Sequence, residues 1–155
     1  MVNPNRPVLE PLGRQIVFTA KSLREAFEDV LASAGASLPG WIVLSTLADV
    51  GRVSQAALAS HVHLEGATIT HHVDRLEAAG LVRRALDPAD RRVRMLELTD
   101  SGAALYGRLL AAAIEFQGVV MAGLSASDRA AMVRCLGVIQ ANLAASAAPA
   151  PPPAA

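Results

Sequence analysis

Apolar residues recur in steps of four and three over long parts of the chain, and this helical period gives way only once to short extended stretches. Such a period predicts helices that bury one face. The first helix is expected over residues 12–35, with its apolar face formed by Leu12, Ile16, Ala20, Leu23, Phe27, Leu31 and Ala34. Gly35 stands where a glycine commonly ends a helix, and Ser37 with Pro39 provides the start of the next one. The pattern predicts a mainly α protein with one small β-hairpin, an α+β fold.

Composition supports packed helices and excludes several kinds of protein. The chain has 155 residues, of which 52% are apolar but only 3% aromatic, so its core must be aliphatic. This length suits one domain of ordinary size. Basic and acidic residues number 14 each, so net charge indicates no particular partner. The single cysteine, Cys135, excludes an intrachain disulfide and a multi-cysteine zinc site.

Neither end of the chain has the pattern of a folded element. Residues 1–11 are polar and interrupted by proline, so we expect a flexible arm. Residues 144–155 are Ala and Pro apart from Ser146, and we expect a disordered tail. No apolar run reaches the roughly 18 residues of a membrane span, and no signal peptide is recognisable. We therefore expect a soluble cytoplasmic protein without a membrane partner.

Two short helices joined by a tight turn are expected in the middle of the chain. Ser54 is a suitable N-cap for the first, and the second is expected over residues 67–79. In the second helix, Ile69, Val73 and Leu76 fall on one face. Polar side chains lie on or near the opposite face, namely Thr68, His71, His72 and Arg75. This arrangement is typical of a helix-turn-helix.

A β-hairpin with a basic tip follows directly. Two short stretches, residues 81–86 and 93–98, are separated by the turn-forming residues 87–90. We call the expected hairpin over residues 81–98 the wing. Between Arg83 and Arg94 there are five Arg against two Asp, so positive charge is concentrated on this hairpin of a neutral protein.

The region from residue 99 to residue 143 predicts two further helices. Thr99 and Asp100 form a suitable start for the first. Its apolar face consists of Leu105, Leu109, Ala112, Phe116 and Val119. Ser125 and Asp128 match a capping box at the start of the last helix. That helix has Met132, Leu136, Ile139 and Leu143 on one face.

A helix-turn-helix beside a basic hairpin is suited to binding duplex DNA. A helix fits the major groove, while an arginine-tipped loop reaches the minor groove or the phosphates. Arg75 is suited to a guanine edge, Thr68 and Thr70 to phosphates or a thymine methyl, and His71 and His72 to phosphates or base acceptors. The alternative for Arg75 is an exposed helix arginine paired with Asp74.

These residues lead to a family resemblance. The stretch Asp87-Pro88-Ala89-Asp90-Arg91-Arg92, followed by Leu98-Thr99-Asp100-Ser101-Gly102, resembles the wing signature of the MarR family, a DPxDRR tip that leads into LTxxG. Gln55 to Leu58, residues 67–77 and Gly80-Leu81-Val82 are similar to the same family's helix-turn-helix and its exit. The resemblance covers about residues 12–145. The pair His71-His72 departs from it, because many relatives carry an arginine and a hydrophobic residue there.

The resemblance implies a winged helix-turn-helix regulator, in most cases a repressor, that binds a pseudo-palindromic operator of double-stranded DNA as a homodimer. Residues 12–35 and 99–143 would be the dimerisation helices around a winged domain at 37–98. Arg92 would enter the minor groove, and Asp90 would orient an arginine. The residues expected to contact DNA are Ser54, Thr68, Thr70, His71, His72, Arg75, Asp90, Arg91, Arg92 and Arg94.

The family's usual switch is a small, often aromatic and anionic effector bound between the dimerisation helices and the winged domain. Here the resemblance points to a cleft lined by Arg14, Phe18, Trp41 and Phe116. The alternative is that the three aromatic residues are simply core.

Other sensing chemistries stay open as alternatives on the same fold. His61, His63, His71 and His72 raise the possibility of a metal site. Because His71 and His72 are adjacent on a helix and diverge, we expect no metal and no cofactor. Cys135 lies beside Met132 and Leu136, so a buried core thiol is favoured over a redox sensor.

The sequence argues against an enzyme. It has no GxSxG, HExxH or P-loop motif, and no GxGxxG that follows a strand. A helical interaction or scaffold protein would explain the long apolar faces but not the wing motif.

Overall fold

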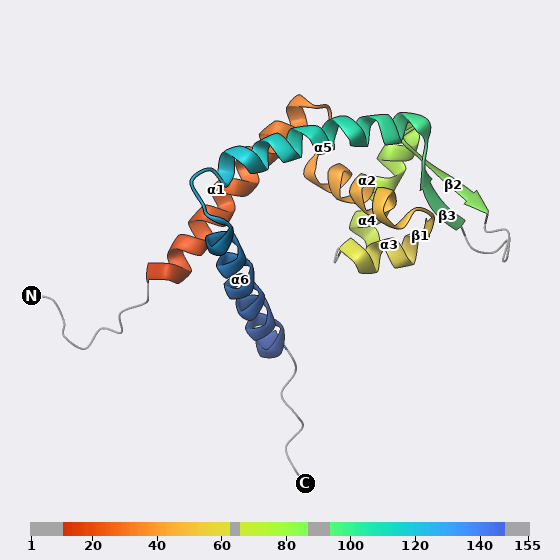
Figure 1. Cartoon of the computed structure of the whole chain (residues 1–155). Coiled ribbons are helices and arrows are strands. Elements are labelled where there is room, and N and C mark those ends of the chain that lie inside the picture. The colour runs from red at the N-terminus through yellow and green to blue at the C-terminus, as the bar shows by residue number, and fades with distance from the viewer. Residues whose placement is uncertain (1–10, 63–65, 87–93, 148–155) are drawn as a thin grey trace, which may run out of the picture. The chain divides into compact units, whose positions relative to one another are not determined.

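The computed structural model describes residues 11–62, 66–86 and 94–147, and the chain divides into two compact units, residues 1–117 and 118–155, which are described separately. Within the described residues the elements, in chain order, are α1 (Pro11–Ser33), α2 (Leu38–Val50), β1 (Val53–Ser54), α3 (Gln55–Val62), α4 (Gly66–Ala78), β2 (Val82–Leu86), β3 (Arg94–Leu98), α5 (Asp100–Val120) and α6 (Ala126–Ala147) (Figure 1). This order confirms the mainly α fold with a small antiparallel sheet.

The three strands form one antiparallel sheet in the order β1-β3-β2. In the predicted hairpin, Val82 pairs with Leu98 and Leu86 pairs with Arg94. Val53 of β1 pairs with Leu96 on the other side of β3. The sequence does not predict β1, because two residues are too few to show an alternating pattern.

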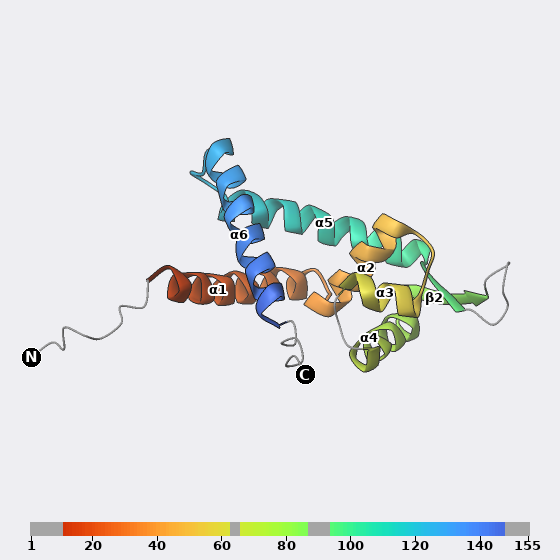
Figure 2. The same ribbon diagram turned by 90° about the horizontal axis from the view of Figure 1, so that it is seen from below.

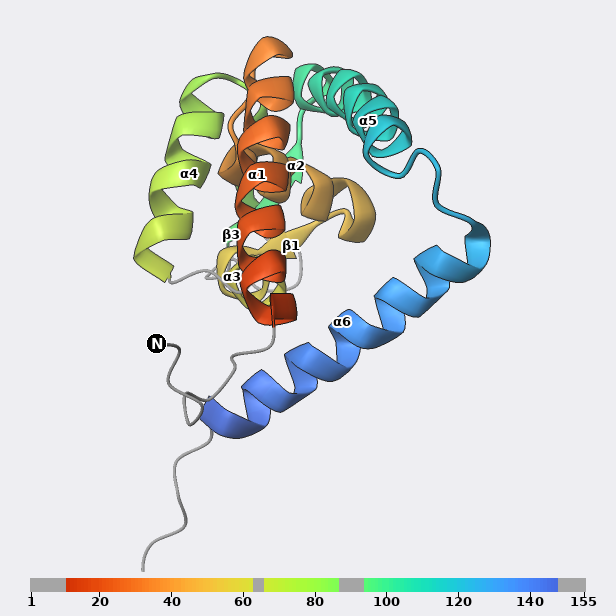
Figure 3. The same ribbon diagram turned by 90° about the vertical axis from the view of Figure 1, so that its left-hand side faces the viewer.

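The core of the first unit is aliphatic, as the composition predicts. Its buried apolar residues are Leu31, Val43, Leu44, Leu47, Val53, Leu58, Ile69, Val73, Val82, Leu96, Leu105 and Leu109. Helix α2 contributes three of these residues and runs between α4 and α5 (Figures 1 and 3). Helices α3 and α4 lie side by side, and α4 packs against β2 (Figure 2). The helix-turn-helix and the hairpin therefore share one core.

Hydrogen-bonded caps mark the predicted helix starts. Ser37 Oγ accepts a hydrogen bond from the amide of Gly40 at 3.3 Å at the start of α2. Ser125 and Asp128 form a reciprocal capping box at the start of α6, with the Asp128 amide 3.2 Å from Ser125 Oγ and the Ser125 amide 3.0 Å from Asp128 Oδ2. The hydrogen bond that the Ser125 hydroxyl donates to Asp128 Oδ2, and secondly the one from the Ser125 amide, lower the pKa of Asp128.

The helix ends differ slightly from the predicted ones. Helix α1 begins at Pro11, since a missing amide hydrogen costs nothing in the first turn. Helix α6 continues to Ala147, past the expected end at residue 143, because alanine has the highest helix propensity. The flexible arm and disordered tail predicted at the chain ends otherwise fall on residues 1–10 and 148–155, outside the described residues.

Four aromatic side chains connect α1, α2 and α5. Phe27 packs edge-on to Trp41, with ring centroids 6.1 Å apart, and stacks on Phe116 at 5.3 Å. Trp41 in turn stacks on Tyr106 at 5.6 Å. Within this cluster, the stack of Phe27 on Phe116 joins α1 directly to α5.

By length and composition alone, α5 is apolar enough to cross a membrane, and α1 with α2 would count as a second such stretch only as a pair bent by 76°. This search covers the described residues. Helix α5 also carries Asp100, Arg108 and Glu115, and its Leu105 and Leu109 are buried in the core.

Candidate nucleic-acid interface

Helices α3 and α4 have the predicted helix-turn-helix arrangement. Ser54 Oγ caps α3 by accepting a hydrogen bond from the Ala57 amide at 3.2 Å. On α4, Ile69 and Val73 are fully buried, and Leu76 packs against the same core. The apolar face of α4 is therefore the predicted one.

The side chains expected to contact DNA do not share one face of α4. His71 and Arg75 are exposed on the outward face. Thr70 is half-buried on one flank, and His72 is half-buried on the other. The backbone of Thr68 is helical, but its side chain is outside the described part of the chain.

Arg75 forms no hydrogen bond or ion pair with any residue that the structure describes. Its expected alternative partner, Asp74, pairs instead with Arg84, at 2.6 Å between Oδ1 and the guanidinium. An exposed guanidinium, whose five donors have no partner among the described residues, is well suited to a guanine edge or a phosphate.

His71 and His72 are adjacent on α4, and their rings lie close together. Their ring centroids are 5.7 Å apart. Burial lowers the pKa of His72 below its ordinary value, and the nearby charges of His71 and Arg75 lower it further. His72 is therefore a neutral imidazole at neutral pH, able to donate one hydrogen bond and accept another.

A network around Arg84, on strand β2, escapes the sequence analysis. Arg84 donates hydrogen bonds to Asp74 and Glu77 of α4 and to Gln55 Oε1 of α3, the last at 3.4 Å. Gln55 Nε2 donates to Thr70 Oγ1 at 2.7 Å. Burial alone would lower the pKa of Arg84, but its bonds and charge interactions with Asp74 and Glu77 raise it. Only contacts between distant segments create this network, so no local pattern signals it.

The strands of the hairpin carry less free positive charge than the sequence suggests. Arg83 pairs with Glu97 on β3 at 2.8 Å, and Arg84 is paired with acids of α4. Arg94 is exposed and makes no ion pair with any described residue. The predicted contact residues Asp90, Arg91 and Arg92 lie outside the described residues. Free positive charge on the described strands is therefore confined to Arg94.

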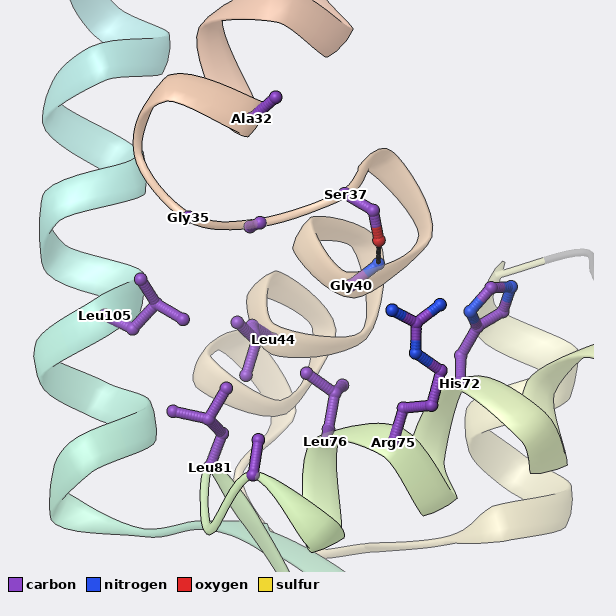
Figure 4. Close-up of a pocket in the computed structure, with 12 residues that line it drawn as sticks. Ala32, Gly35, Ser37, Gly40, Leu44, His72, Arg75, Leu76, Leu81 and Leu105 are labelled. Atoms are coloured by element: carbon purple, nitrogen blue, oxygen red, sulfur yellow. Dashed lines mark hydrogen bonds between the residues drawn. The ribbon is translucent and has the colours of Figure 1, made fainter.

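A pocket of about 420 Å³ lies on the His72 flank of α4 (Figure 4). It is lined by Ala32, Gly35, Ala36, Ser37, Gly40, Leu44, His72, Arg75, Leu76, Ala79, Leu81 and Leu105. In Figure 4 the side chains of His72 and Arg75 rise from α4 towards the start of α2, opposite an apolar wall that includes Leu44 and Leu105. A volume in the range of about 300–1,000 Å³ is typical of small-molecule sites.

None of the four residues expected to line an effector cleft lines this pocket. Arg14 and Phe18 are exposed on α1, with Phe18 at 62%. Trp41 and Phe116 belong to the aromatic cluster with Phe27. That these residues form an effector cleft stays a prediction.

Cys135 and the histidines are the residues that would serve redox or metal sensing. The sequence favours a buried thiol at Cys135, but this residue is exposed on α6, as are its neighbours Met132 and Leu136. Among the described residues, no three His, Cys, Asp or Glu side chains come close enough to hold a metal ion. His63 lies outside the residues that the structure describes.

Comparison with known proteins places the chain among bacterial regulators. Residues 37–93 match the model of the MarR family. The chain is 38% identical over 96 residues to the HTH-type transcriptional repressor NicR of Pseudomonas putida, a match that covers 62% of this chain and 61% of NicR, less than two thirds of that protein. It is 30% identical to the HTH-type transcriptional regulator TtmR of Methylorubrum extorquens, over 98% of this chain and 83% of TtmR.

The fold has close structural relatives. A structure of BpsR of Bordetella bronchiseptica, whose DNA binding is described as regulated by 6-hydroxynicotinic acid, superimposes with a TM-score of 0.73 at 25% identity and covers 84% of this chain and 99% of BpsR.

Proposed function

Because the chain belongs to the MarR family, and is thus a DNA-binding transcriptional regulator and not an enzyme, we propose that it binds a pseudo-palindromic operator as a homodimer and represses neighbouring genes in the cytoplasm. We further propose that a small aromatic or anionic effector releases it from the operator. In this proposal helix α4 contacts the base edges of the operator, and the wing makes the second contact with the DNA.

The outward face of α4 carries the proposal. His71 and Arg75 project from the face opposite the core, and no described residue competes for the guanidinium of Arg75. An α-helix with such side chains fits the major groove, where Arg pairs with the O6 and N7 of guanine. Asp90, Arg91, Arg92 and Arg94 are the proposed wing contacts, with Arg92 in the minor groove.

Exposed apolar residues on the long helices support a homodimer. On α6 these are Met132, Val133, Leu136, Val138 and Leu143, and on α1 they are Leu12, Val17, Phe18 and Leu23. Apolar surface of this extent on a soluble chain requires a partner. A twofold dimer would place its two α4 helices about 34–36 Å apart, one turn of DNA.

The pocket beside α4 supports the effector part of the proposal. Its apolar wall suits an aromatic ring, and Arg75 supplies a cation for a carboxylate. The chemistry agrees with the ligand named for BpsR, an aromatic acid. Titration with a panel of benzoic and hydroxynicotinic acids, monitored by the fluorescence of Trp41, tests this part directly.

Selection of bound sequences from a random duplex pool, at a stated salt concentration, tests the DNA-binding part. The expected result is an enriched palindrome whose half-sites are about 10–10.5 base pairs apart, centre to centre. The salt concentration matters, because nonspecific phosphate binding strengthens steeply at low ionic strength. Failure to enrich any sequence, with and without the acid panel, would overturn the proposed function.

A further inference from the structure

One flank of α4 is polar and partly exposed, and it contacts neighbouring elements of the protein. Thr70, Asp74 and Glu77 are spaced by four and three residues, so they line up between the buried face and the outward face. Gln55 of α3 and Arg84 of β2 meet this flank. The flank therefore joins three elements: both helices of the helix-turn-helix and the first strand of the wing.

Arg84 is the centre of this junction. Its side chain is only 17% exposed, whereas that of its neighbour Arg83 is 67% exposed. The guanidinium donates to Asp74 and Glu77, one helical turn apart, and to Gln55. A planar fork can satisfy several acceptors in fixed directions, and the single ammonium of a lysine cannot.

The network fixes direction more than it adds stability. Both carboxylates are partly exposed, at 57% for Asp74 and 39% for Glu77, and ion pairs of this kind contribute little to folding. Base contacts, by contrast, depend on donor-acceptor distances within a few tenths of an ångström. A small rotation of α4 relative to β2 would carry its outward side chains out of register with base edges.

We propose that Arg84 is a positioning residue for sequence recognition: by bridging Asp74 and Glu77 of α4 from strand β2, it fixes the orientation of α4 relative to β2 as the two elements meet the duplex. Arg84 itself does not contact DNA in this arrangement, since its donors are directed to Asp74, Glu77 and Gln55. Its effect is on the ratio of specific to nonspecific affinity.

The experiment compares Arg84→Ala with Arg83→Ala. Both remove one positive charge from the same strand, so a purely electrostatic effect is the same for both. The full-length wild-type chain first selects its preferred duplex from a random pool. Dissociation constants of each variant are then measured for that duplex and for a scrambled duplex of equal composition, at several salt concentrations.

We expect Arg84→Ala to lower the ratio of specific to nonspecific affinity by about tenfold or more, the scale of one lost base contact. Arg83→Ala should change the ratio by less than about twofold, because among the described residues Arg83 pairs with Glu97 of the wing itself and not with α4. Arg84→Lys should restore part of the loss. The nonspecific affinity of Arg84→Lys should match that of the wild type.

A second variant keeps the test decisive if Arg84→Ala fails to fold, as judged by circular dichroism. Asp74→Asn with Glu77→Gln leaves every arginine in place and preserves the side-chain shapes, but removes the charged acceptors. It should lower the same ratio, while its nonspecific affinity stays equal or rises with the added positive charge.

Two results would overturn the inference. Equal ratios for the wild type, Arg84→Ala and the Asp74→Asn/Glu77→Gln variant would show that the bridge does not set specificity. A loss for Arg84→Ala that is equal on both duplexes, with the salt dependence reduced by about one counterion, would make Arg84 a phosphate contact instead. A wild-type chain that enriches no duplex would overturn the proposed function, and this inference with it.

Discussion

Gly102, in the first turn of α5, lies against the backbone carbonyl of Leu81, so close that a Cβ atom at this position would overlap the carbonyl oxygen. Thr99 strengthens the same junction: its Oγ1 donates to the carbonyl of Gly80 at 2.7 Å and accepts from the amide of Gly102 at 3.0 Å. This close contact and these hydrogen bonds hold the start of α5 against the turn that connects α4 with β2.

Replacing Gly102 with Ala should therefore destabilise the protein. Because the clash is with backbone, the chain must move, and overpacking of this kind costs about 1–3 kcal/mol. Urea unfolding measures the change. Gly107→Ala is the control, since nothing lies within 4 Å of a Cβ there and alanine should stabilise the helix by up to about 1 kcal/mol. Equal effects of the two substitutions would contradict the close contact.

Arg75→Ala should relax base preference in the major groove. Arg75 is exposed on α4 without a described partner, and loss of a bidentate guanine contact costs about 1–3 kcal/mol at one base position. Binding to the selected duplex and its single-base variants measures this. Arg108→Ala, on α5, removes the same charge and should leave the preference unchanged. Uniform weakening across all bases would reduce Arg75 to a phosphate contact.

Arg92→Ala should weaken binding where the operator has a narrow, A·T-rich minor groove, because such grooves attract an inserted guanidinium. The measurement compares duplexes with A·T-rich and G·C-rich flanks. Arg83→Ala removes an equal charge from the wing and should not change the preference for flanks. If Arg92→Ala bound its operator as well as the parent protein, the assignment of the wing contact would be wrong.

Sequence reasoning was strongest where structure is local. Caps at Ser37 and Ser125 and the apolar face of α4 were predictable, because helix starts and helix faces depend on residues a few positions apart. In the sequence Arg84 is one of five arginines that make the wing basic, and nothing nearby indicates its pairing, because its acceptors lie seven to 29 residues away in the chain. Pairing between residues far apart in the chain produces no periodic pattern in the sequence.

The pocket illustrates the same limit. Its lining combines the end of α1, α2, α4 and α5, so its residues share no motif. The family resemblance points to Arg14 and Phe18 as lining residues of an effector cleft. The fold places both on the exposed surface of α1.

Acid should destabilise the protein through His72. Burial, His71 and Arg75 lower the pKa of His72 from 6.5 in the folded state. Below pH 6.5 the unfolded chain therefore binds more protons than the folded one, so stability is complete above this pH and falls as the pH drops towards the folded pKa.

Unfolding by urea between about pH 7.5 and 5.5 measures this loss, which should be smaller in His72→Gln. His71→Gln should raise the pKa of His72 only part of the way, as followed by NMR, because burial is the largest cause of the shift. An identical pH dependence in the wild type and in His72→Gln would remove His72 as the cause.

Leu136→Asp should convert the homodimer into monomers. Met132, Leu136 and Leu143 recur along one side of α6 and are exposed in the single chain, at 45%, 44% and 65%. Burying a carboxylate in the middle of an apolar dimer contact is strongly unfavourable.

Ala141→Asp is the matched control, because it adds the same charge to the opposite side of the same helix. Sedimentation velocity should give a monomer for Leu136→Asp and a dimer for Ala141→Asp. Dimers of both variants would place the contact elsewhere, whereas monomers of both would mean that all of α6 is enclosed by the partner.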